Sequence, residues 1–177
     1  MEMVDELNSN GSPTGRQVSK QEAHIKGLWH RAAHVWFVNS SGQILLQKRA
    51  KGMENSPGEY DISAAGHLQA GDTSIMGALR EVSEELGVNL KESDLIKIGE
   101  VTQEQILRNG AYINKEYNDI YIVHTDIPVK DFILQESEVD SVKYISIEEF
   151  KLLVSETKIN LVRHPDEFEI LLNYLSK

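Results

Sequence analysis

Three glutamates, Glu81, Glu84 and Glu85, lie in one short stretch and form the group in this sequence best suited to metal chemistry. At about 100° per residue on a helix, these positions share one broad face. Like charges three or four residues apart repel one another, so a compensating cation is expected beside them. Arg80 supplies one positive charge, and carboxylate oxygens favour Mg²⁺, Mn²⁺ or Ca²⁺ over softer metals. The alternative interpretation is a solvated acidic helix face without a ligand.

The residues around these glutamates form a longer pattern. Gly66 is followed by five residues and Asp72, then by seven residues and the run Arg80-Glu81-Val82-Ser83-Glu84-Glu85-Leu86-Gly87-Val88. This pattern resembles the Nudix box, G-x5-E-x7-R-E-U-x-E-E-x-G-U with U apolar, and departs from it only at Asp72. A chance match in a chain of this length is expected on the order of once in several hundred thousand. Asp72 keeps the carboxylate on a shorter arm, so its ion pair with a nearby base is the feature expected to change.

The resemblance to Nudix hydrolases extends from about Trp29 to Phe150 and implies a fold, a cofactor and a ligand set. The implied fold is α/β, an α/β/α sandwich around a mixed β-sheet. The implied cofactor is Mg²⁺, with Mn²⁺ as the alternative. By the same resemblance, the metal ligands are expected to be the backbone carbonyl of Gly66 and the side chains of Glu81, Glu84 and Glu85.

The chemistry implied by the box is hydrolysis of a diphosphate linkage. Anionic phosphorus repels nucleophiles, so a catalyst must screen charge, orient a water molecule in line and accept its proton. The proton acceptor is either Glu81, oriented by Arg80 and supported by Glu84, or a carboxylate outside the box. Glu116 is the first outside candidate and Asp119 the second. The alternative for Glu116 is an exposed charge at a strand end.

Two further residues are candidate substrate ligands. The guanidinium of Arg49 matches the geometry of a phosphate, although a solvated arginine at a strand end is the competing interpretation. His67 follows Gly66 and is a second candidate, although a lone histidine is more often a packing residue. The remaining determinants of substrate identity are expected in loops around Met53–Pro57 and Gln103–Asn114.

The histidines suggest a second branch of the same superfamily. His24, the run Trp29-His30-Arg31-Ala32 and the run Ala65-Gly66-His67 resemble isopentenyl diphosphate isomerases, in which equivalent histidines bind metal. Those isomerases rely on a cysteine directly before the Gly-His pair, where this chain has Ala65 and no cysteine anywhere. An alanine methyl cannot exchange a proton, so the complete box favours hydrolysis. An isomerase-like enzyme and a non-catalytic module that binds a nucleotide or metabolite are the alternatives.

Composition limits the class of partner. The formal charge of −10 and the pI of about 5.1 argue against a surface that grips a nucleic acid polymer or anionic lipid. The sequence has no basic, apolar leader and no apolar run long enough to span a bilayer, so the cytoplasm is the expected location. The expected partner is a small-molecule diphosphate, here a nucleoside diphosphate derivative or related metabolite. The superfamily suggests a homodimer.

The predicted elements alternate between strands and helices, which favours a layered α/β arrangement. Residues 1–28 are expected to form an extension or hairpin packed on a Nudix hydrolase domain spanning 29–177, with a turn at Asn8–Gly15. Helical spacing is clearest between Thr73 and Leu86, where Asp72 or Thr73 can cap the start and Gly87 the end. The other predicted helices are Ile147–Ser155 and Pro165–Leu175, and the predicted strands are Arg31–Val38, Ile44–Leu46, Tyr60–Ala65, Ile96–Gln105, Tyr117–Thr125 and Val142–Ile145.

Overall fold

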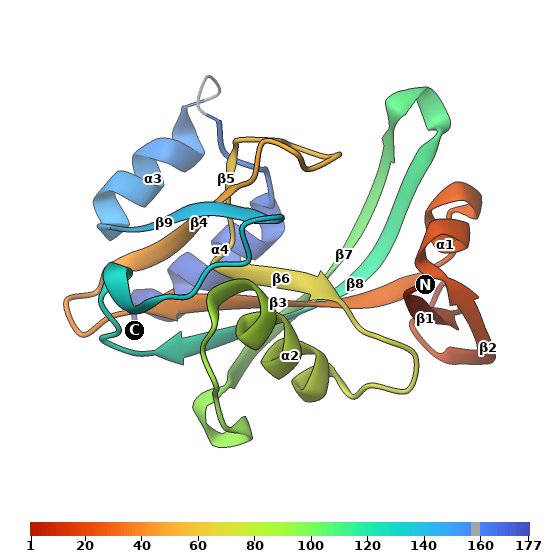
Figure 1. Cartoon of the computed structure of the whole chain (residues 1–177), viewed down its shortest axis with the longest axis horizontal. Coiled ribbons are helices and arrows are strands. Elements are labelled where there is room, and N and C mark those ends of the chain that lie inside the picture. The colour runs from red at the N-terminus through yellow and green to blue at the C-terminus, as the bar shows by residue number, and fades with distance from the viewer. Residues whose placement is uncertain (157–159) are drawn as a thin grey trace.

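The computed structural model describes residues 1–156 and 160–177, and its centre is a mixed sheet between two layers of helices (Figure 1). The strands of the sheet are β3 (His30–Val38), β4 (Ile44–Arg49), β5 (Tyr60–Asp61), β6 (Ala64–His67), β7 (Ile96–Leu107), β8 (Tyr112–His124) and β9 (Val139–Ile145). Their order is β5-β4-β3-β8-β7, with β6 paired to β3 and β9 paired to β4. The β3–β8 pair is parallel and the other pairs are antiparallel. The predicted α/β/α sandwich around a mixed sheet is confirmed.

The two faces of the central strand β3 pack against different helical layers. Val35 and Phe37 face the helix α2 (Ser74–Leu86) in one hydrophobic cluster. Trp36 points the other way, into a cluster with the helices α3 (Ile147–Ser155) and α4 (Pro165–Leu175). This alternation follows from the two-residue period of a strand. His34 and Ala32 therefore lie on the same side of the sheet as α4.

The helix α2 begins and ends where its capping residues stand. The Thr73 side chain accepts a hydrogen bond from the backbone N–H of Met76, and Gly87 ends the helix in the left-handed conformation with φ 67°. Thr73, the second of the two predicted caps, therefore closes the start of the helix. Without a Cβ, glycine adopts this conformation at little cost, which fixes the C-terminus of α2.

The predicted single strand Tyr60–Ala65 is wrong, because the chain changes partner within it. Residues Tyr60–Asp61 pair with β4 as β5, and Ala64–His67 pair with β3 as β6. The break is held by Ser63, whose hydroxyl donates to the backbone carbonyl of Leu45 and accepts from the backbone N–H of Phe37. The partner switch carries Gly66 and His67 toward the start of β3.

The segment Gln103–Asn114, expected as a loop, is largely a β-hairpin. β7 and β8 remain paired as far as Leu107 and Tyr112, and they extend beyond the rest of the sheet as an arm (Figure 1). Arg108 at its tip donates hydrogen bonds to Glu54 and Asn55 in the loop between β4 and β5.

The first residues form a hairpin and a short helix beside this arm. β1 (Met3–Leu7) and β2 (Pro13–Ser19) pair antiparallel, so the predicted turn ends at Ser12 instead of Gly15. The helix α1 (Lys20–Lys26) follows and ends at Gly27, where an added Cβ would lie 2.8 Å from Ile113 Cγ2. That close approach seats α1 against β8. The division at residue 28 stays a prediction. Among the helices in the described residues, none is long and apolar enough to cross a bilayer.

Candidate metal centre and adjoining pocket

Four side chains from four elements meet at the junction of the sheet and α1. They are His24 of α1, His30 of β3, His67 of β6 and Glu116 of β8, and their ligand atoms all lie within 4.8 Å of one another. His67 Nε2 lies 2.8 Å from Glu116 Oε1, and His30 Nε2 lies 3.5 Å from the same oxygen. We call these four residues the histidine centre.

Strand register explains why residues so far apart in sequence meet here. The parallel β3–β8 pairing places His30 opposite Glu116. The antiparallel β3–β6 pairing places Ala32 opposite His67, one step further along the same face of β3. His24 then approaches from α1, where its Nε2 lies 3.0 Å from the hydroxyl of Tyr112.

The donor atoms of the histidine centre fit a divalent metal. His24 Nδ1, His30 Nε2 and His67 Nε2 are buried and form no hydrogen bond of good geometry with the described residues, although the last two both face Glu116 Oε1. His30 Nδ1 lies 2.8 Å from the backbone carbonyl of Leu28, a contact that assigns its proton to Nδ1 and leaves the Nε2 lone pair free. Buried polar atoms without partners are costly, so a ligand is expected to complete them.

The charge state of the histidine centre also suits a metal. Burial, reinforced by His67 and His30, lowers the pKa of His24 to about 4. Burial likewise lowers the pKa of His67 despite its contact with Glu116. Burial alone would raise the pKa of Glu116, but contacts with His30 and His67 hold it well below the ordinary value. Neutral imidazoles beside an ionised carboxylate are the forms that coordinate cations.

The glutamates of the box lie next to this centre, around Gly66. Arg80 Nη1 donates to Glu81 Oε1 at 2.6 Å and to Glu84 Oε2 at 3.3 Å, and Arg80 Nη2 donates to the backbone carbonyl of His67 at 2.8 Å. Glu81 is buried, whereas half of the Glu84 side chain is exposed. Burial raises the pKa of Glu81 to about 7 against the opposing charge of Arg80.

Glu85, unlike Glu84, is buried. Its Oε2 accepts hydrogen bonds from Gln47 Nε2 at 2.8 Å and from the backbone N–H of Ala65 at 3.1 Å. Burial, with the charge of Glu81 second, raises the pKa of Glu85 to about 8. The raised pKa values of Glu81 and Glu85 indicate a site where a bound cation would stabilise the ionised carboxylates.

The described residues bring two sets of ligand atoms within 4.8 Å, and neither contains a box glutamate. The ligand set Gly66, Glu81, Glu84 and Glu85 therefore stays a prediction. Arg80 donates hydrogen bonds to two of these glutamates, Glu81 and Glu84, and so supplies the positive charge that was expected beside the acidic cluster. Asp72 also reaches this arginine, with Arg80 Nε 3.6 Å from its Oδ2.

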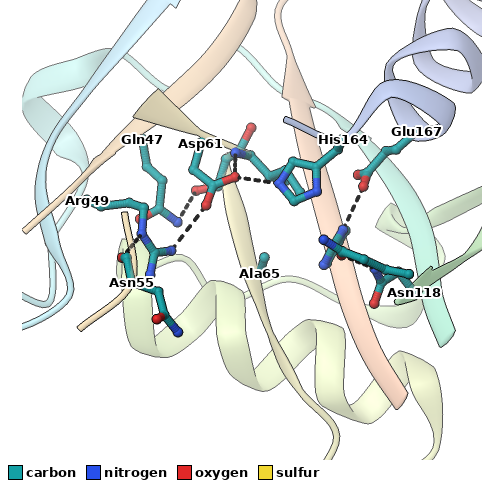
Figure 2. A network of polar contacts seen from close by, with 12 residues as sticks. Gln47, Arg49, Asn55, Asp61, Ala65, Asn118, His164 and Glu167 are labelled. Atoms are coloured by element: carbon teal, nitrogen blue, oxygen red, sulfur yellow. Dashed lines mark hydrogen bonds and ion pairs between the residues drawn. The ribbon is translucent and has the colours of Figure 1, made fainter. Parts of the chain in front are cut away.

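A small pocket of about 120 Å³ connects the histidine centre to a second group of charged residues. His67 and Glu116 line one part of it, and Arg49, Asp61, His34 and His164 line another. Figure 2 shows Asp61 between Arg49 and His164, with Arg49 Nη1 donating to Asp61 Oδ2 at 3.1 Å and His164 Nε2 3.0 Å from Asp61 Oδ1. Arg49 thus lies at a cavity, and its guanidinium is partly used by protein acceptors.

Several sequence expectations change in this setting. Glu116 is 6% exposed inside β8, so the alternative of an exposed strand-end charge is wrong. Asp119 is buried and pairs with Arg31 and Lys97, away from the histidine centre. His24 and His30 join the site as well, and the resemblance of their sequence pattern to the isomerases is the signal that points to them.

Comparisons with known proteins agree with this geometry. A family model described as NUDIX domain matches residues 28–164. The chain is 44% identical over 157 residues to Nudix hydrolase 3 of Arabidopsis thaliana, covering 87% of this chain but only 20% of the plant protein. It is 35% identical over 148 residues to the isopentenyl-diphosphate Delta-isomerase of Pectobacterium atrosepticum, covering 83% of this chain and 76% of that protein. The crystal structure of DR0079 from Deinococcus radiodurans matches with a TM-score of 0.73 at 16% identity, covering 98% of this chain and 99% of that one.

Proposed function

The chain belongs to the Nudix hydrolase superfamily, and on that premise we propose that it is a metal-dependent enzyme that cleaves a diphosphate linkage in a small molecule. The hydrolases of this family act on phosphorus-containing acid anhydrides. The observation that carries the proposal is the histidine centre, two of whose members, His67 and Glu116, line a pocket together with Gly66 of the box. The substrate class within the proposal is a nucleoside diphosphate derivative or related metabolite.

The donor sets favour different cations. Carboxylate oxygens such as those of Glu81 and Glu84 suit Mg²⁺ or Mn²⁺. A centre with three imidazoles and one carboxylate favours a transition metal such as Mn²⁺ over Mg²⁺, because imidazole nitrogen is the softer ligand. When bound, such cations screen the charge of a diphosphate and lower the pKa of water.

We assign the following roles to the protein's own residues. Glu81 accepts the proton of the attacking water, because its pKa of about 7 is suited to a base at neutral pH. Arg80 holds the Glu81 carboxylate in place, and Glu84 shares that contact. Glu116, buried among imidazoles, is better suited to a ligand role than to proton transfer. Arg49 binds phosphate at the far side of the pocket.

A screen of diphosphates with product detection by ³¹P NMR tests this proposal. The purified chain is incubated with Mg²⁺ or Mn²⁺ and nucleoside, sugar or isoprenoid diphosphates. We expect metal-dependent cleavage that is lost in Glu84→Gln and Glu85→Gln. His124→Gln, an exposed histidine at the end of β8, is the matched control and should retain activity. Turnover that survives both glutamate substitutions would exclude the proposed site.

Isopentenyl diphosphate isomerisation is the second candidate, favoured by the 35% identity to a bacterial isomerase and by the histidine centre. Ala65 lines the pocket at the position expected to carry the proton-exchanging cysteine. Deuterium incorporation from D₂O into an isoprenoid diphosphate distinguishes the two reactions. We expect none, with phosphate-containing products released instead. A non-catalytic module would bind such compounds tightly without forming any product.

A further inference from the structure

His34 lies in the middle of β3 on the pocket side, and α4 fixes its orientation. Its Nδ1 is 2.7 Å from Oε2 of Glu167, in the first turn of α4. The other oxygen of Glu167, Oε1, accepts a hydrogen bond from Trp36 Nε1 at 2.7 Å. Glu167 is 1% exposed and both of its oxygens are engaged. The imidazole of His34 is therefore held in one position by a buried carboxylate, and Figure 2 shows the Glu167 side chain extending from α4.

The ion pair with Glu167 favours a His34 ring that carries a proton on each nitrogen at neutral pH. Burial works against the charge, but the ion pair with Glu167 outweighs it and raises the pKa of His34 to about 9. The groups that face this imidazolium are Glu167 from α4, Glu116 from β8, Asp61 from β5 and the ring of His164, whose centroid is 5.5 Å away. None of the side-chain hydrogen bonds among residues 1–156 and 160–177 engages His34 Nε2. One N–H of a buried cation thus lacks a protein acceptor.

A purely structural ion pair does not account for this arrangement. Trp36 already anchors Glu167 to β3, so α4 does not need a second, charged donor for attachment. Buried ion pairs contribute little net stability relative to apolar packing. A metal bound by His34, His164 and Glu167, whose ligand atoms lie within 4.8 Å, would have to displace the proton that joins His34 to Glu167. The short hydrogen bond favours the proton.

The pocket has room for a hydrogen-bond acceptor next to the N–H donor of His34. The pocket has a volume of about 120 Å³, and His34 and Arg49 line it together. The histidine centre lies on the same pocket through His67 and Glu116. Cationic donors in one part and a candidate metal centre in another match a ligand with two linked phosphate groups.

We propose that His34, positioned by Glu167, is a substrate-binding residue whose Nε2–H donates to the phosphate group farther from the histidine centre, with Arg49 as the second donor. This inference rests on the proposed function and names the part of the substrate that the pocket recognises. The recognised unit is the diphosphate itself, so inorganic pyrophosphate is the minimal ligand.

Calorimetry with inorganic pyrophosphate tests the inference on the Mn²⁺-loaded protein. We expect His34→Gln to weaken pyrophosphate binding by about ten- to a hundredfold, the range for loss of a hydrogen bond to a charged group. Glu167→Gln should weaken it less, because the imidazole remains but loses its orientation and charge. His124→Gln is the control and should bind as the wild type does. Equal affinity of His34→Gln and the wild type would overturn the inference while leaving diphosphate hydrolysis intact.

A second measurement uses only the wild-type protein, so it does not depend on how the variants fold. ¹⁵N NMR of the histidine rings in Mg²⁺ at pH 7.5 should show both nitrogens of His34 protonated. Adding pyrophosphate should shift the Nε2 resonance and leave His124 unchanged. An unmoved Nε2 resonance at saturating pyrophosphate, or a neutral His34 ring, would overturn the inference. A wild-type protein that binds no pyrophosphate with either metal would overturn both the inference and the proposed function.

Discussion

Gly66 and Glu81 lie so close that no side chain fits between them. A Cβ added to Gly66 would lie 2.1 Å from Cδ of Glu81 and 2.3 Å from its Oε2. The glycine of the box therefore makes the space that the first glutamate of the box occupies. The residue after this glycine is His67, so the same backbone segment serves the box and the histidine centre.

Gly66→Ala should abolish most activity with only a small loss of stability. The added methyl collides with the end of a flexible side chain, so Glu81 can rotate away without unfolding the chain. Misplacing a catalytic group by about 1 Å costs on the order of a hundredfold in rate. Initial rates and thermal melts check both parts. Gly52→Ala, where an added Cβ meets nothing within 4 Å, should change neither.

Removing ligands from the histidine centre should weaken Mn²⁺ binding. His67→Gln and Glu116→Gln each replace a donor that lies within 4.8 Å of the other ligand atoms. Loss of an outer partner costs about ten- to a hundredfold in metal affinity, so loss of a direct ligand should cost more than about a hundredfold. Titration followed by the electron paramagnetic resonance signal of free Mn²⁺ measures this. Unchanged affinity in both variants would place the metal elsewhere.

Glu85→Gln should stabilise the metal-free protein near neutral pH while removing activity. The pKa of Glu85 rises from 4.5 to about 8 on folding, so ionisation penalises the folded state progressively between these values. At pH 7 the penalty is on the order of 3 kcal/mol. Both hydrogen bonds at this side chain end on Oε2, so an amide oxygen can accept them. Urea unfolding in EDTA at pH 5 and pH 7 measures the gain, and a variant less stable than wild type at pH 7 contradicts the expectation.

The ion pair of His34 should appear as a pH dependence of stability. The folded pKa of about 9 exceeds the ordinary 6.5, so the contribution is fully present below pH 6.5 and disappears as pH rises through 9. The free energy of unfolding of the wild type, relative to His34→Gln, should fall by roughly 3 kcal/mol from pH 6 to pH 9.5. Urea unfolding at a series of pH values gives this difference. A constant difference would show that His34 is neutral in the folded protein.

The sequence predicted the parts of this molecule that depend on local spacing. The period and caps of α2, including Thr73 and Gly87, follow from residues next to one another in the chain. The same holds for the contact of Arg80 with Glu81, because these residues are adjacent. The box also identified the family, and with it the sandwich architecture.

The histidine centre depends on non-local geometry, which local spacing does not report. His30 meets Glu116 through the register of two parallel strands that are distant in sequence. His24 enters only because Gly27 lets α1 approach β8. The pairing of His34 with Glu167 likewise requires α4 to lie across β3, so the spacing of residues along the chain does not predict it. The break between β5 and β6 is also non-local, because Ser63 binds two neighbouring strands at once.

The most direct measurement is a manganese anomalous difference map from crystals soaked with Mn²⁺ and a non-hydrolysable diphosphate. We expect a peak bonded to His24, His30, His67 and Glu116, a second site at the box glutamates, and the diphosphate between the first peak and Arg49. A map with no peak among the three histidines at saturating Mn²⁺, or a diphosphate bound outside this pocket, would contradict the proposed metal-dependent hydrolysis at this site.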